Sequence, residues 1–215
     1  MSISEGTSEA IFQSKPLWYY ITDRRQLPEK TLLPNIRRVI NRGVDFVQIR
    51  EKDLSDRQLF DLTRRVIALA RSTRCRVLVN GRADIALAAG AHGVHLPSQG
   101  LRLADLKLWL PPGFLAGVSI HSIREGRLAA SQGADYVLLG PVFPTPSKAR
   151  YGPPLGLEYL RRARGSLPLV VLALGGIRPD NIDSVLNIGV AGVAGISLFQ
   201  DAAEQIPLSL EKSRF

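Results

Sequence analysis

Short apolar runs alternate with longer segments of helical periodicity along this chain. The runs are nearly continuous in hydrophobic residues, which is typical of parallel strands covered by helices. They predict eight strands, at Leu17–Thr22, Val44–Ile49, Arg76–Val79, Gly93–Leu96, Leu115–Val118, Tyr136–Leu139, Leu169–Leu174 and Gly192–Ile196.

The segments between the runs repeat apolar residues at three and four positions, as amphipathic helices do. They predict helices at Pro34–Asn41, Ser55–Ala70, Ala83–Ala89, Leu103–Leu110, Ser122–Gln132, Leu157–Arg164, Pro179–Ile188 and from Leu198 onward. Ser55 is a good N-cap residue, and Pro179 suits a first helical position. Four helices are followed, shortly before the next strand, by a glycine that indicates a C-cap: Gly43, Gly90, Gly133 and Gly189.

Eight strand–helix units in succession favour a closed barrel over an open sheet. We therefore predict an α/β protein with a single (β/α)8 TIM barrel over residues 17–215, preceded by a flexible, polar tail over residues 1–16. An open flavodoxin-like or Rossmann sheet is the alternative. The Rossmann version is disfavoured because no G-x-G-x-x-G motif follows the first strand.

The net charge of +9 raises the question of an anionic partner. Basic residues are spread in pairs such as Arg24-Arg25 and Arg161-Arg162, without interleaved aromatics, so we interpret most of them as solvated helix faces. We expect a small anionic ligand and neither a nucleic acid nor a membrane as partner, and leave a homo-oligomer open. The single cysteine, Cys75, rules out an internal disulfide, and no secretory signal is recognisable, so a cytoplasmic location is expected.

In a barrel, the residues directly after each strand meet at one end. Those that could bind a ligand there are Gln48, Arg50, Lys52, Asn80, Ser119, His121, Thr145, Ser147, Lys148, Gly176, Ile196 and Ser197. The loops after strands seven and eight are the usual phosphate site of such barrels, and Gly175-Gly176 would allow close approach of the backbone. The alternatives are ordinary glycine turns, a surface turn with an exposed Lys148, and an ion-pair network of Arg50, Glu51 and Lys52.

Several strings carry a more specific signal. They are VQIREKD at Val47–Asp53, VNGRADIAL at Val79–Leu87, GVHLPS at Gly93–Ser98, GVSIHS at Gly117–Ser122, ADYVLLGPVFPTPSK at Ala134–Lys148, LGGI at Leu174–Ile177 and GIS at Gly195–Ser197. This set resembles the thiamine phosphate synthase and TenI family, whose fold is the same barrel. In the synthase branch, the loop that matches Thr145–Lys148 contacts the diphosphate and the thiazole phosphate.

The chain departs from the synthase pattern where that branch holds Mg²⁺ with carboxylates. It has Gly81 in Asn80-Gly81-Arg82 and Gly100 in Pro97-Ser98-Gln99-Gly100. Asp84 begins a helix and matches a structural position, and Asp105 lies too far along the next helix to replace the lost ligand. These departures are similar to the TenI branch of thiazole tautomerases, which isomerise a phosphorylated carboxythiazole without a metal.

We therefore predict a TenI-like thiazole tautomerase that binds a thiazole phosphate and needs no cofactor. The resemblance implies His121 as its acid–base, with Ser119 and Ser122 able to orient the ring or to hold the substrate carboxylate. A histidine that only packs or forms hydrogen bonds is the alternative. His92 is expected to be structural and His95 to line the wall. Two other functions stay open: a thiamine phosphate synthase with a rebuilt metal site, which would use Mg²⁺ to join hydroxymethylpyrimidine diphosphate and thiazole phosphate, and a non-catalytic sensor of a phosphorylated ligand.

Overall fold

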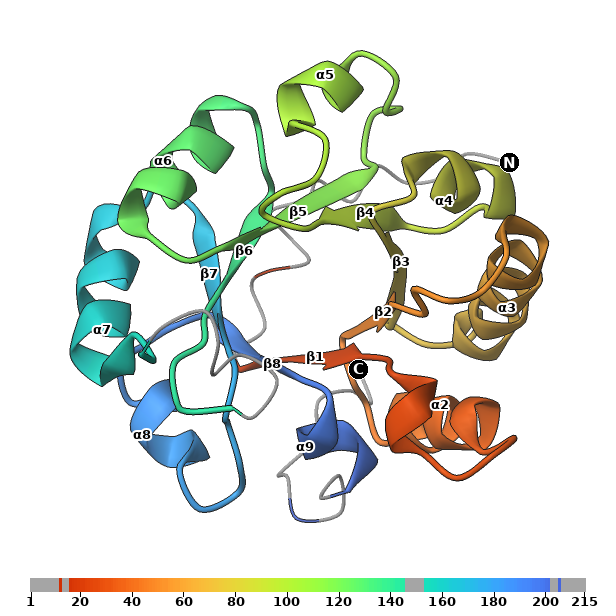
Figure 1. Cartoon of the computed structure of the whole chain (residues 1–215), viewed down its shortest axis with the longest axis horizontal. Helices are drawn as coiled ribbons and strands as arrows, with labels where there is room; N and C mark the ends of the chain where they lie inside the picture. Colours follow the sequence, from red (N-terminus) through yellow and green to blue (C-terminus); the bar gives the residue numbers. More distant parts are fainter. Residues whose placement is uncertain (1–11, 13–15, 146–152, 202–204, 206–215) are drawn as a thin grey trace.

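The computed structural model describes residues 12, 16–145, 153–201 and 205. Eight parallel strands pair in chain order, and the last closes on the first (Figure 1). The strands are β1 Leu17–Ile21, β2 Phe46–Ile49, β3 Arg76–Asn80, β4 Gly93–Leu96, β5 Leu115–Ile120, β6 Tyr136–Leu139, β7 Val170–Leu174 and β8 Gly192–Gly195. The helices around them are η1 Arg24–Gln26, α2 Leu32–Asn41, α3 Asp56–Ala70, α4 Ala83–Ala89, α5 Leu103–Lys107, α6 Ile123–Ser131, α7 Gly156–Ser166, α8 Ile182–Leu186 and α9 Ser197–Gln200.

The pairing of β1 closes the barrel. Leu17 is in register with Gly192 of β8, and Tyr19 is in register with Phe46 of β2. The predicted (β/α)8 barrel is therefore confirmed, and each strand boundary lies within two residues of its prediction.

Two hydrophobic layers hold the barrel together. One lies between the strands and the surrounding helices, and the other fills the interior with alternate strand residues, among them Tyr19, Phe46 and Tyr136. The ring of Phe12 joins the interior layer, with its centroid 6.0 Å from that of Phe46 and 5.9 Å from that of Tyr136. The rest of the predicted tail before residue 16 lies outside the described residues.

The helix ends follow the predicted signals with one exception. Ser55 caps α3 in a capping box with Gln58, and the four predicted C-cap glycines all have positive φ. Pro179 does not begin a helix, because α8 starts only at Ile182. The Asn181 side chain accepts a hydrogen bond from the Arg178 backbone and donates one to the Gly176 carbonyl, which makes this segment a turn.

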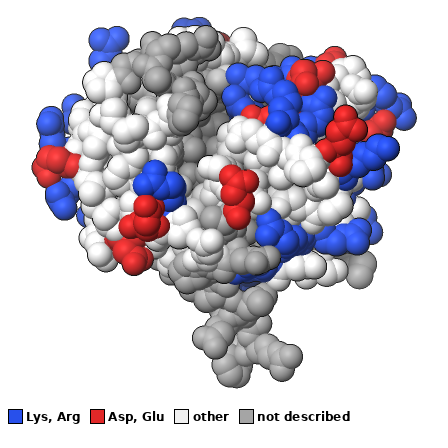
Figure 2. All heavy atoms as spheres, turned by 60° about the horizontal axis from the view of Figure 1, so that its bottom comes forward, with Lys and Arg blue, Asp and Glu red and all other residues white. Residues whose placement is uncertain are grey.

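No helix in the described part of the chain is long and apolar enough to cross a membrane. On the face shown in Figure 2, basic side chains lie in several groups with acidic ones among them. Ion pairs occur along the helices as well, as between Arg57 and Asp61 on α3, with 3.0 Å between Nε and Oδ2. This distribution agrees with the interpretation of the basic residues as solvated helix faces.

Candidate functional site

The predicted binding residues continue the rows of side chains that point into the barrel. Phe46, Leu78, Leu115, Leu172 and Ala194 belong to the interior cluster. Because side chains alternate along a strand, residues two or four positions further on point the same way. These residues are Gln48, Asn80 and Ser119. Ile196, directly after β8, packs against the same cluster, and Gly176 follows β7 in the neighbouring loop. The structure therefore brings them together at the C-terminal end of the barrel.

Arg50 contributes a positively charged guanidinium at this end of the barrel. Its backbone N–H donates to Thr22 Oγ1 at 3.0 Å, and its guanidinium has no hydrogen-bond or ion-pair partner among the residues that the structure describes. Glu51 is buried and accepts hydrogen bonds from the Arg24 backbone at 3.2 and 3.1 Å, and burial raises the pKa of its carboxyl group. Glu51 thus ties the loop to η1, with 3.7 Å between its Oε2 and the Arg24 guanidinium. The alternative of an ion-pair network therefore holds for Glu51, and within the described residues Arg50 takes no part in it. Lys52 is exposed.

The loops after β7 and β8 contribute backbone amides. Gly176 has φ of 67°, and a Cβ there would lie 2.6 Å from the Cβ of Phe143, so the position requires glycine. The amides of Gly176 and Ile196 have no acceptor within the described ranges. Ser197 follows as the first residue of α9. These amides are suited to an anion.

The loop after β6 is described only as far as Thr145, which is half-buried. Ser147 and Lys148 lie outside the described residues. Their predicted contact with a phosphate stays a prediction.

His121 lies exposed just beyond β5. Its ring Nδ1–H donates to the Gly140 carbonyl at 2.5 Å, and its backbone N–H donates to Glu125 Oε2 at 2.7 Å. Ser122 Oγ accepts from the Glu125 backbone and caps α6, while Ser119 binds a different histidine. The expectation that these two serines orient the His121 ring is therefore wrong, because the carbonyl of Gly140, directly after β6, does so.

A chain of polar side chains crosses the barrel interior. Gln48 Nε2 donates to the Tyr19 hydroxyl at 2.8 Å, and that hydroxyl lies 2.9 Å from the Tyr136 hydroxyl. The Tyr136 oxygen lies 3.1 Å from His95 Nδ1, and His95 Nε2 lies 2.8 Å from Ser119 Oγ. Burial lowers the pKa of His95 to about 3, so the imidazole is neutral at physiological pH.

Sequence reasoning missed Tyr19 and Tyr136, the two tyrosines of this hydrogen-bond chain. They stand in apolar strands and looked like core residues, although each shares the inward parity of a polar residue on a neighbouring strand. His95 lines the interior wall as expected, and the structural role of His92 is confirmed, because its Nδ1 accepts from the Val77 backbone at 3.0 Å.

The side chains at this end of the barrel do not fit an Mg²⁺ site built from carboxylates. Gly81 and Gly100 supply no carboxylate. A Cβ at Gly100 would lie only 3.0 Å from Pro97 Cγ, whereas one at Gly81 would make an ordinary contact with Pro97 Cδ at 3.8 Å, although the φ of 69° at Gly81 favours glycine. Asp84 is paired with Arg82, which also binds Asp56. No group of three metal-ligating side chains occurs among the residues described.

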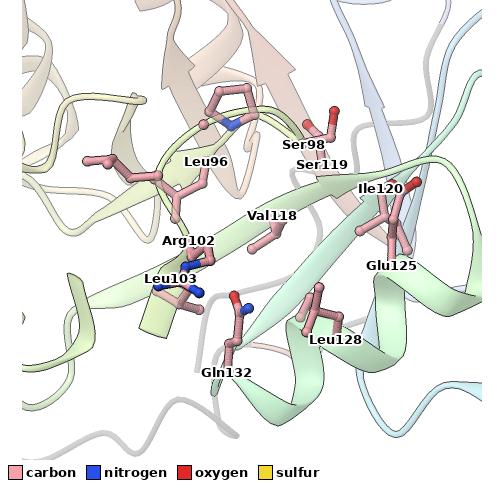
Figure 3. Close-up of a pocket in the computed structure, with 14 residues that line it drawn as sticks. Leu96, Ser98, Arg102, Leu103, Val118, Ser119, Ile120, Glu125, Leu128 and Gln132 are labelled. Carbon is pink, nitrogen blue, oxygen red and sulfur yellow. The ribbon is translucent and has the colours of Figure 1, made fainter. Parts of the chain in front are cut away.

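A hollow of about 100 Å³ lies nearby, outside the ring of strands (Figure 3). Leu96, Val118 and Ile120 border it from the strands, and Leu128 of α6 and Gln132, directly after α6, border it from the other side. The three strand residues belong to the layer between strands and helices. Ser119 also borders this hollow, but Arg50 and the Gly176 and Ile196 amides do not, so we place the candidate site at the end of the barrel instead.

Comparison with known proteins identifies the family. Residues 18–199 match the family described as "Thiamine monophosphate synthase". A Geobacter sulfurreducens protein named "Putative thiamine-phosphate synthase" is 46% identical over 179 residues, covering 83% of this chain and 84% of that protein. The "Thiamine-phosphate synthase" of Syntrophomonas wolfei is 36% identical over 186 residues, covering 86% and 89%. The structure titled "Thiamine phosphate pyrophosphorylase from Pyrococcus furiosus" superimposes with a TM-score of 0.79 at 33% identity, over 88% of this chain and 93% of that one.

These relatives overturn the prediction of a thiazole tautomerase, because they carry the name of the synthase. That prediction gave too much weight to the absence of carboxylates at Gly81 and Gly100. The loss of two ligands changes how a metal is bound. A phosphate-binding site at the strand ends serves both the tautomerase and the synthase reaction, so its presence cannot discriminate between them. The chain belongs to the thiamine monophosphate synthase family.

Proposed function

We propose that this chain is a thiamine-phosphate synthase, a transferase that joins hydroxymethylpyrimidine diphosphate to a thiazole phosphate. The observation that carries the proposal is the 36–46% identity to proteins of that name over more than four-fifths of the chain. The aligned region includes the whole C-terminal end of the barrel. In the reaction, the thiazole ring nitrogen forms a bond to the methylene carbon that carried the diphosphate, and pyrophosphate leaves with the electron pair of the broken C–O bond.

The side chains and amides at the site suit this chemistry. Negative charge grows on the diphosphate as it leaves, so donors that face it stabilise the transition state more than the ground state. Arg50, whose guanidinium has no partner in the part of the chain that the structure describes, lies on one side of β1, and the amides of Gly176 and Ile196 approach from the strands on its other side. Each charge-assisted hydrogen bond is worth roughly 1.5–3 kcal/mol.

We propose further that the protein has no resident Mg²⁺ site built from carboxylates. Such a site usually supplies one or two carboxylates beside the substrate phosphates. Here glycine, which has no carboxylate, stands at both positions where the family resemblance implies one, and the nearby Asp84 is paired with Arg82. We therefore propose that Arg50 and the backbone amides stabilise the negative charge of the leaving diphosphate.

The test is to incubate the protein with both substrates and follow products by ³¹P NMR. We expect thiamine phosphate and pyrophosphate in equal amounts, and neither product when one substrate is left out. Parallel reactions with Mg²⁺ and with a chelator measure the metal dependence. If a thiazole phosphate binds but no product forms under either condition, the synthase proposal fails and the sensor alternative is favoured.

A further inference from the structure

Five side chains form a continuous row of hydrogen bonds inside the barrel, and one end of this row reaches the C-terminal end of the barrel. Tyr19, Gln48, His95 and Tyr136 are each at most 1% exposed. Ser119 is half-buried and belongs to the inward row that leads to the C-terminal end. The chain therefore connects a fully buried amide to a hydroxyl that a ligand can reach.

The amide sets the direction of the first two bonds. Gln48 approaches Tyr19 with Nε2, a group that only donates, so the Tyr19 oxygen accepts. Tyr136 is the other hydrogen-bond partner of this hydroxyl in the described structure, so the Tyr19 proton goes to Tyr136. In the opposite arrangement the Tyr19 proton would face no acceptor in a fully buried place, which is costly.

The remaining bonds follow from this start. Tyr136 accepts from Tyr19 and donates its own proton to His95 Nδ1. A neutral imidazole that accepts at Nδ1 carries its proton on Nε2, which donates to Ser119 Oγ. Since Ser119 Oγ already accepts from His95, its own proton remains available for another acceptor.

We propose that Gln48 fixes the polarity of this chain and that His95 is a positioning residue, which holds Ser119 as a hydrogen-bond donor toward a substrate. The inference rests on the proposed function for the identity of the substrate, whose pyrimidine ring nitrogens are acceptors of the required kind. A chain of reversed polarity would make Ser119 an acceptor and would select a substrate donor instead. A buried group with a fixed role discriminates strongly against analogues that cannot pair with it.

The first test is the tautomer of His95, measured by ¹⁵N NMR on protein labelled at histidine. The sequence has three histidines, so the spectrum is simple, and loss of signals in His95→Gln assigns the residue. Separate His92→Gln and His121→Gln variants assign it by elimination if that variant does not fold. We expect a neutral ring protonated on Nε2 at neutral pH. A ring protonated on Nδ1, or a doubly protonated ring, overturns the proposal.

The second test is a double-mutant cycle between Tyr136→Phe and Ser119→Ala in the synthase assay. Each single variant should lower kcat/KM roughly tenfold, the effect of losing one hydrogen bond. Tyr136→Phe should cost little more in protein that already lacks the Ser119 hydroxyl, because it acts through that hydroxyl. An equal cost in both backgrounds would show that Tyr136 contributes only to folding, and overturns the positioning role.

A conservative variant separates positioning from packing. His95→Gln keeps a donor on a side chain of similar length, so it should retain more activity than His95→Leu. Equal loss in the two variants contradicts the proposal. The tautomer measurement does not depend on catalysis: an Nε2-protonated ring in a protein without synthase activity supports the polarity and refutes the proposed function alone.

Discussion

Gly117 makes room for the central tyrosine of the barrel, and its replacement by alanine tests the packing described here. A Cβ at this position would lie 2.0 Å from Tyr136 Cζ and 2.4 Å from its hydroxyl oxygen, whereas ordinary contacts begin at 3.4 Å. The ring cannot easily retreat, because Tyr19 and Phe46 pack against it with centroids 5.8 and 6.1 Å away. Overpacking costs ~1–3 kcal/mol, and a displaced hydroxyl leaves a buried partner unsatisfied at another ~1–3 kcal/mol.

Gly117→Ala should therefore lose about 2–6 kcal/mol of unfolding free energy, which lowers the thermal midpoint by roughly 10 °C in a chain of this size. Gly165→Ala in α7 is the matched control, because nothing lies within 4 Å of its added Cβ. Alanine in a helix is favoured over glycine by up to ~1 kcal/mol, so this variant should be unchanged or slightly more stable. Thermal unfolding followed by circular dichroism compares the two. If Gly117→Ala melts with the wild type, the position of the Tyr136 ring is wrong.

Three further predictions concern the charge, the buried histidine and the metal. Arg50→Ala should lower kcat/KM roughly 10- to 100-fold in steady-state kinetics, with the activity of Arg50→Lys between that of Arg50→Ala and the wild type. Arg57→Ala, on the surface of α3, is the control and should leave activity unchanged. Equal activity of Arg50→Ala and wild type would contradict the anion site. Because burial lowers the pKa of His95 to about 3 from 6.5, the unfolded chain takes up a proton first on acidification. The free energy of unfolding should therefore decrease as the pH is lowered from about 6.5, by up to ~1.4 kcal/mol per pH unit. The urea midpoint of His95→Gln should depend less on pH than that of the wild type, and parallel pH profiles of the two proteins would contradict this. Calorimetric titration of the substrate-free protein with Mg²⁺ should show no specific binding, and a saturable site would refute this.

Much of the site could be predicted from residue order. A polar residue at the end of an apolar strand identified Gln48, Arg50 and Ser119, because the strands of a parallel barrel all end on one side. The roles of individual groups could not be predicted this way. Which carboxylate accepts from the Arg24 backbone and which histidine meets Ser119 depend on contacts between segments that are 27 and 24 residues apart in the sequence.

The sequence by itself determined the eight strand–helix units, the four glycine C-caps and the family, because hydrophobic periodicity and turn chemistry are local properties. Even so, it misplaced the start of α8, where Asn181 is used as the N-cap and Pro179 lies in the turn before it. Only the tertiary structure showed that Tyr19 and Tyr136 link Gln48 to His95, and that Pro97 lies against Gly100, one of the two glycines that replace carboxylates. The physical reason is that barrel closure brings inward side chains from distant strands within hydrogen-bond reach, and the partners they find there are fixed by packing across the interior and not by their neighbours in sequence.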